Sequence, residues 1–147
     1  MQGNQQRVKL TMKTAIEKIL ATHGILEAFR DTNNYSVKIE NEPFMMLCIE
    51  KHGRLIFLTH YYEQNGDLVG DPDMELVDLG FEDWAPIAIQ HATGHYARAG
   101  ECKEGEWYLN RKLFKDLEAF TRMWAKNLLD QGLNGLILSG RVLPEIA

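Results

Sequence analysis

The sequence predicts an α+β domain, in which an antiparallel meandering sheet of about five strands is flanked by an N-terminal helix and a long C-terminal helix. Helical periodicity appears near both ends of the chain, whereas alternating or short apolar runs fill the region between residues 35 and 98. These runs follow one another without intervening helices, which is typical of α+β domains. With 147 residues and 45% apolar content, residues 1–147 suit a single domain.

The N-terminal helix is indicated by apolar residues at three- and four-residue spacing from Met12 to Leu20. Thr14 and Glu17 have the spacing of a capping box, and Thr11 is a competing N-cap one turn earlier. Gly24 can adopt the left-handed conformation that ends a helix, so we expect the end near His23. Residues 1–10 are polar without apolar periodicity and are expected to be frayed.

A further helical turn over residues 25–30 and a polar turn cluster at 31–34 lead into the predicted sheet. Residues 35–40 alternate between apolar and polar, which predicts a half-buried edge strand. Two nearly continuous apolar runs, residues 44–50 and 54–62, surround Gly53 and predict a central antiparallel hairpin.

The next hairpin spans residues 60–76 and turns at Asn65-Gly66, a dipeptide that accepts the positive φ angles of a type I′ turn. Counting outward from this turn gives the expected pairs Gln64 with Asp67, Glu63 with Leu68, Tyr62 with Val69 and His60 with Asp71. Pro72 lacks an N–H and should interrupt the ladder. Beyond it, Met74 and Leu76 should face one side of the sheet and Asp73 and Glu75 the other.

The remaining strands are predicted at residues 84–91 and 95–98, and residues 99–105 are expected to form a loop. His91 and His95 should lie on either side of a turn at Thr93-Gly94.

The long C-terminal helix is predicted from Arg111 to Leu129, with Asn110 as its N-cap and Gly132 as its stop. Its apolar stripe consists of Leu113, Leu117, Phe120, Trp124 and Leu128. The tail from residue 133 contains Leu136-Ile137-Leu138 and should pack as an extra strand or a short docked segment.

Composition and motifs exclude several classes of protein. The formal net charge of −5 argues against a phosphate-binding surface over the whole molecule, so nucleic acid is not expected as a direct ligand. Cys48 and Cys102 match no metal-binding spacing, which suits a reducing cytoplasm. No signal peptide, membrane span or nucleotide-binding glycine pattern is found, so we expect a cytoplasmic protein without membrane partner or cofactor.

The candidate binding residues lie in the acidic hairpin and are His60, Tyr62, Asp71, Asp73 and Glu75. Carboxylates and imidazole can ligate a divalent cation, which makes His60, Asp71, Asp73 and Glu75 an alternative metal set. Asp71, Asp73 and Glu75 are expected on one face of a strand, where neighbours are too far apart for two of them to chelate one ion without help from another element. The competing interpretation is a solvated face whose charges protect a sheet edge from pairing with other molecules.

The hairpin sequence His60-Tyr61-Tyr62-Glu63-Gln64-Asn65-Gly66-Asp67-Leu68, followed by Asp71-Pro72-Asp73-Met74 and Trp84-x-Pro86, resembles an uncharacterised family of small proteins. Members of that family are associated with conjugative elements, plasmids and phages of bacteria. The resemblance covers roughly residues 42–96 and implies no established activity. It does imply a setting of mobile DNA, where small acidic accessory proteins commonly act by binding other proteins.

The leading hypothesis is therefore a non-enzymatic accessory or interaction protein that binds a protein partner through the acidic, aromatic hairpin. One alternative is a metal-dependent hydrolase or nuclease that uses the hairpin carboxylates. Another is an acidic DNA mimic, although 16 basic residues are interspersed with the 21 acidic ones. A homo-oligomer stays open.

Overall fold

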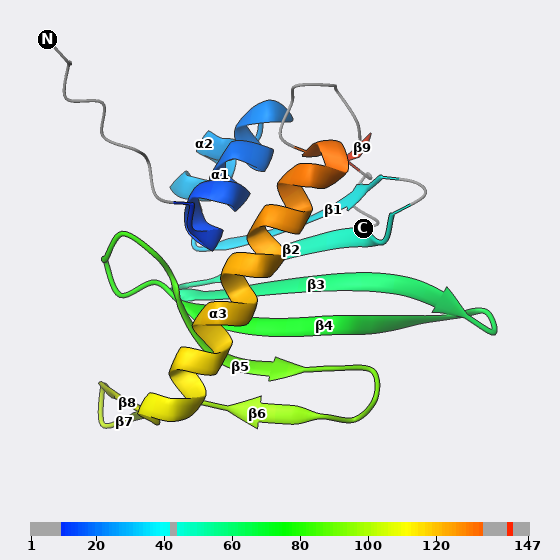
Figure 1. Cartoon of the computed structure of the whole chain (residues 1–147). Coiled ribbons are helices and arrows are strands. Elements are labelled where there is room, and N and C mark those ends of the chain that lie inside the picture. Colours follow the sequence, from blue (N-terminus) through cyan, green and yellow to red (C-terminus); the bar gives the residue numbers. More distant parts are fainter. Residues whose placement is uncertain (1–9, 42–43, 134–140, 143–147) are drawn as a thin grey trace, which may run out of the picture.

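The computed structural model describes residues 10–41, 44–133 and 141–142. Three helices and nine strands form within these ranges (Figure 1). The helices are α1 (Met12–Thr22), α2 (Leu26–Asp31) and α3 (Arg111–Leu128), and a π-helical turn, Leu129–Leu133, follows α3. The strands are β1 (Asn34–Glu40), β2 (Met46–His52), β3 (Leu55–Gln64), β4 (Asp67–Val77), β5 (Ala85–Gln90), β6 (Tyr96–Arg98), β7 (Gly100–Lys103), β8 (Glu106–Leu109) and β9 (Arg141–Val142).

The main sheet has the strand order β6-β5-β4-β3-β2-β1-β9, and β3 is its central strand. Strands β1 to β6 form a meander, because each pairs antiparallel with the next in sequence. Strand β9 is a two-residue addition at the outer edge of β1. The predicted α+β class, with a meandering sheet between an N-terminal and a long C-terminal helix, is confirmed.

The helices cover one face of this sheet. Helix α3 crosses the strands at a steep angle (Figure 1), and its Thr121 hydroxyl lies 3.5 Å from the Met74 sulfur of β4. The core between helices and sheet includes Met12, Ile16 and Ile19 of α1, Leu58 of β3 and Trp124 of α3. None of the described helices has the length and hydropathy needed to cross a membrane.

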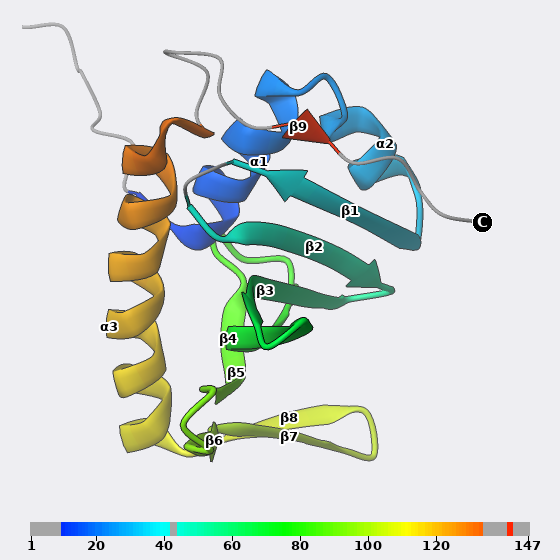
Figure 2. The same ribbon diagram turned by 90° about the vertical axis from the view of Figure 1, so that its right-hand side faces the viewer.

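Strands β7 and β8 form a separate two-stranded hairpin, so the loop predicted for residues 99–105 is wrong. Glu104 and Gly105 have φ angles of 52° and 81°, which suit a two-residue turn between Lys103 and Glu106. Figure 2 shows this hairpin projecting away from α3, toward the side of the sheet that the helices leave uncovered. We call that side the open face.

Side-chain caps set the starts of the two longer helices. The Thr14 backbone N–H donates to the Thr11 hydroxyl at 3.1 Å, and the Thr11 N–H donates to the Thr14 hydroxyl at 3.0 Å. Thr11 is therefore the N-cap, and the alternative capping box of Thr14 with Glu17 is wrong. At α3, Asn110 accepts from the Leu113 N–H at 3.1 Å, as predicted.

The ends of the helices agree with the predictions to within a few residues. His23 is the C-cap of α1, as expected. Helix α3 ends at Leu128, and the π-helical turn carries the chain through Gly132, the predicted stop. The prediction for Leu136-Ile137-Leu138 lies outside the described residues, as do residues 1–9 of the segment 1–10 that is expected to be frayed.

Candidate functional site

The hairpin of β3 and β4 keeps the predicted register near its turn. Gln64 pairs with Asp67, Glu63 with Leu68 and Tyr62 with Val69, as expected. The predicted pair of His60 with Asp71 is wrong, because Tyr61 pairs with Gly70 while Thr59 pairs with Asp73. Asp71 and Pro72 thus stand together opposite the single residue His60, which is a β-bulge. Pro72 has no N–H with which to continue the ladder there.

His60 lies on the helix-covered face of β3 and is only 4% exposed. Its ring meets that of Trp124 edge to face, with the centroids 5.3 Å apart. Burial lowers the pKa of His60 to about 4, so the imidazole is neutral near pH 7. By strand alternation the half-buried Tyr62 shares this face. A partner approaching from outside therefore has no access to His60 in this conformation.

Asp71 also belongs to the helix side of the sheet. Its carboxylate lies 3.2 Å from Nδ1 of His91, which follows β5. The His91 ring in turn meets Phe120 of α3 edge to face, with centroids 5.5 Å apart. His95 lies across the β5–β6 turn from His91, with ring centroids 5.9 Å apart, as the sequence predicted. The contact of Asp71 with His91 thus links the bulge to the next turn.

Asp73 and Glu75 face the opposite way, onto the open face. Two registered rows of residues cross all six meander strands there. One row is Lys38, Cys48, Thr59, Asp73, Gln90 and Tyr96, and the other is Ser36, Glu50, Phe57, Glu75, Ala88 and Arg98. Neighbouring members of a row lie about 4.8 Å apart, because this is the spacing of adjacent strands.

The two carboxylates on the open face differ in their partners. Glu75 forms an ion pair with Arg98 at 3.2 Å, and its side chain is 21% exposed. Asp73 is exposed and accepts a hydrogen bond from the Thr59 hydroxyl at 3.1 Å. Within the described residues no ion pair joins Asp73 to a basic side chain.

A hollow of about 180 Å³ opens on this face beside the two carboxylates. Its lining consists of Phe57, Asp73, Glu75, Ala88, Ile89, Gln90, Tyr96 and Arg98. The Arg98 guanidinium donates to the Tyr96 hydroxyl at 2.8 Å, to the Gly100 carbonyl at 3.0 Å and to Glu75 at 3.2 Å. The hydrogen bond to Tyr96 and the charge of Glu75 raise the pKa of Arg98, which stays cationic.

The four residues of the alternative metal set do not converge. His60 and Asp71 lie on the helix side, whereas Asp73 and Glu75 lie on the open face. In the part of the chain that the structure describes, no group of three or more His, Cys, Asp or Glu side chains is arranged to hold a metal ion. Of the cysteines, Cys102 is exposed, and Cys48 is buried with its pKa raised to about 11, mainly by that burial.

Comparison with known families adds one match. The profile of a domain of unknown function, DUF6908, matches residues 14–134. The chain belongs to the DUF6908 family. This agrees with the expected membership of an uncharacterised family. No curated protein and no solved structure matches the chain.

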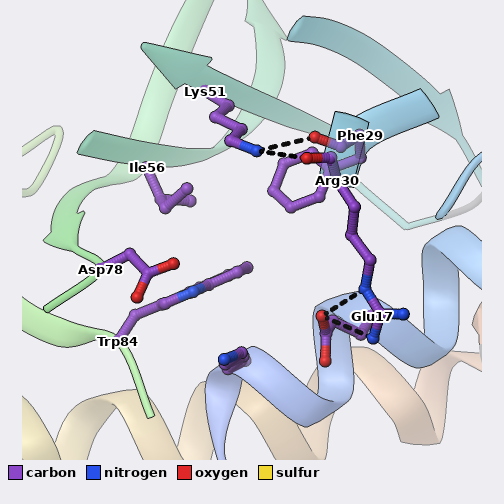
Figure 3. A pocket seen from close by; sticks show the side chains of 8 residues that line it. Glu17, Phe29, Arg30, Lys51, Ile56, Asp78 and Trp84 are labelled. Atoms are coloured by element: carbon purple, nitrogen blue, oxygen red, sulfur yellow. Dashed lines mark hydrogen bonds and ion pairs between the residues drawn. The ribbon is translucent and has the colours of Figure 1, made fainter. Parts of the chain in front are cut away.

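A second hollow of this DUF6908 chain, about 200 Å³, lies where α1 and α2 meet the ends of the sheet strands (Figure 3). Arg30 pairs with Glu17 at 3.1 Å across it. The Lys51 ammonium donates to the Phe29 carbonyl at 2.8 Å at the end of α2 and lies 4.9 Å from the centre of the Phe29 ring. The ion pair joins α2 to α1 and the Lys51 contacts join α2 to β2, so this hollow is explained by the fold.

Sequence reasoning missed four contributors to the open face: Phe57, Gln90, Tyr96 and Arg98. They come from β3, β5 and β6, and only the register of these strands brings them beside Asp73 and Glu75. Strand alternation could have placed each of them on a face. No local signal specifies which residues stand opposite one another across three strands.

Proposed function

We propose that this DUF6908 protein is a cytoplasmic, non-enzymatic interaction protein that binds a protein partner on its open sheet face. The observation that carries this proposal is Asp73, an exposed carboxylate beside a hollow with aromatic and amide walls. The neighbouring carboxylate on the same face, Glu75, is paired with Arg98. A partner that supplies a basic group would complete the pairing of Asp73.

Exposed apolar side chains near this face support a protein as the partner. Tyr96 is 52% exposed at the edge strand β6, and Tyr108 is 55% exposed on the β7–β8 hairpin. Aromatic residues are enriched where proteins bind one another, because a large ring supplies contact area at little cost in conformational entropy. Leu68, which is 59% exposed and pairs with Glu63, extends the available surface toward the tip of the β3–β4 hairpin.

Charge on the open face favours a protein partner over the role of a DNA mimic. A mimic needs a run of negative charge that copies the phosphate backbone. Lys38 stands at the β1 end of one row and Arg98 at the β6 end of the other, so basic groups bound the acidic surface on both sides and keep it short. The carboxylates between them form a small acidic centre that suits one or two basic side chains.

The context that we propose for the partner is a bacterial mobile element. This part of the proposal rests on the resemblance of residues 60–74 to small proteins of conjugative elements, plasmids and phages. The protein would then act as an accessory factor for another protein of the element or of its host.

Affinity capture from the native host tests the proposal. Asp73→Ala should abolish recovery of the partner that the wild type recovers. Asp71→Ala should reduce it little, because Asp71 contacts His91 on the helix side. Asp116→Ala is the matched control, since it removes one exposed carboxylate from α3. Recovery that Asp73→Ala leaves unchanged would refute binding at the open face.

A further inference from the structure

We propose that the open-face hollow, formed by Phe57, Asp73, Gln90 and Tyr96 with Glu75 and Arg98 at its side, receives one arginine side chain of the partner. This inference rests on the proposed function and deepens it, because it names the chemical group that the surface recognises. Three features of the hollow favour arginine: its size, its aromatic and polar walls, and the binding of the chain's own Arg98 guanidinium beside it.

The size of the hollow suits a single side chain. Its volume of about 180 Å³ is below the roughly 300–1,000 Å³ of clefts that enclose a whole drug-sized ligand. Ala88 lies between Glu75 and Arg98 in its row and is only 4% exposed, and the 3.2 Å ion pair of these two neighbours spans it. An occupant that enters from solvent therefore lies beside this ion pair, against Asp73, Gln90 and the aromatic rings of the lining.

The walls combine acceptors with aromatic rings. Asp73 and Gln90 are cross-strand partners on adjacent strands, and adjacent strands lie about 4.8 Å apart. A carboxylate and an amide oxygen therefore line the same part of the hollow. Phe57 and Tyr96 also line the hollow and offer ring surface to the stem and the flat face of a guanidinium. Arginine suits this set better than lysine, because its planar fork of donors can serve two acceptors while it stacks on a ring.

Arg98 shows that the open face already binds a guanidinium of the chain itself. Its three donor nitrogens find a tyrosine hydroxyl, a backbone carbonyl and a carboxylate at 2.8–3.2 Å. The Glu75 carboxylate is thereby already paired with a guanidinium of the same chain. Asp73, one row away and exposed, offers the second carboxylate of the hollow to an arginine from outside.

Titration of the full chain with a model compound tests the inference. The probe is N-acetyl-arginine amide at constant ionic strength, followed by NMR through the backbone amides of Asp73, Gln90 and Tyr96. We expect saturable shifts at these residues with the arginine probe and none with N-acetyl-citrulline amide, which has nearly the same shape but no charge. N-acetyl-lysine amide should bind more weakly than the arginine probe.

Two variants sharpen this titration. Asp73→Asn should weaken binding of the arginine probe at least about tenfold, because hydrogen bonds to a charged group contribute more than neutral ones. Asp116→Asn, which makes the same charge change on α3, should leave it unchanged. Equal binding of citrulline or lysine, unsaturable shifts, or insensitivity to Asp73→Asn would each overturn the inference.

The outcome can be separated from that of the proposed function. If Asp73→Ala abolishes partner capture while the arginine probe fails to bind, the partner uses another group and only the arginine inference fails. If the arginine probe binds but the wild type captures no partner that depends on Asp73, the interaction with a protein fails instead.

Discussion

His60 and Trp124 pack ring against ring, and each buries a ring nitrogen. Their rings meet edge to face with centroids 5.3 Å apart and planes inclined by 73°. Within the described residues, neither His60 Nε2 nor Trp124 Nε1 has a hydrogen-bond partner. A buried polar group without a partner costs roughly 1–3 kcal/mol, so this contact favours packing at the expense of hydrogen bonding.

Acidification should therefore destabilise the protein through His60. The pKa of His60 is about 4 in the fold, against 6.5 for a histidine in water, so the unfolded chain binds its proton first. The free energy of unfolding should fall as the pH drops from about 6.5 toward 4, by up to about 3 kcal/mol from this residue. It should not change through His60 above that range.

Chemical unfolding of the wild type and His60→Phe between pH 7 and 4.5 measures this effect. The variant should lose the part of the pH dependence that His60 contributes, whereas His23, whose pKa burial also lowers, should keep contributing. His95→Gln is the control, because His95 is exposed, and it should keep the wild-type dependence. Parallel curves for the wild type and His60→Phe would show that His60 is not the buried titrating group.

Gly100→Ala should destabilise the junction between β6 and β7. A Cβ atom at this position would lie 2.7 Å from Ile87 Cγ2 and 2.9 Å from Leu109 Cδ2. Both distances are shorter than the closest approach of non-bonded carbon atoms in proteins. The neighbouring side chains must shift, and such overpacking typically costs about 1–3 kcal/mol. Urea unfolding measures the loss. A variant within about 0.5 kcal/mol of the wild type would contradict the close packing of this glycine.

Asn110→Ala should weaken the start of α3. The Asn110 side chain accepts from the Leu113 N–H at 3.1 Å, and loss of such a cap costs about 0.5–2 kcal/mol. Asn127→Ala is the matched control, since Asn127 is exposed inside the same helix and alanine there favours the helix. Thermal unfolding should show a lower Tm for Asn110→Ala than for the wild type and no lower Tm for Asn127→Ala. An equal effect of both would argue against the cap.

The fold could be predicted largely from periodicity, because a helix or strand with one buried face carries that face in its sequence. The stripe of α3 and the alternation of Met74 and Leu76 with Asp73 and Glu75 are examples. The β7–β8 hairpin was missed because Glu104-Gly105 is a weaker turn signal than Asn65-Gly66. Its strands are also only four residues each.

The site could be predicted only in part. Alternation correctly put Asp73 and Glu75 on one face. Counting outward from the hairpin turn, however, assumes that each residue of one strand pairs with a single residue of the other. The bulge at Asp71 and Pro72 breaks that assumption and leaves His60 and Asp71 on the other face from Asp73. Arg98 joins Glu75 only through two further strand pairings, whose register depends on packing across the whole sheet.

Site-specific photo-crosslinking in the native host tests the central claim most directly. A photoreactive amino acid replaces Tyr108, which is 55% exposed on the β7–β8 hairpin beside the open face, or Asp116, which is exposed on α3. The claim predicts one discrete crosslinked protein from position 108, lost when Asp73 is changed to alanine, and none from position 116. Crosslinking of a partner from position 116 but not from position 108 would contradict it.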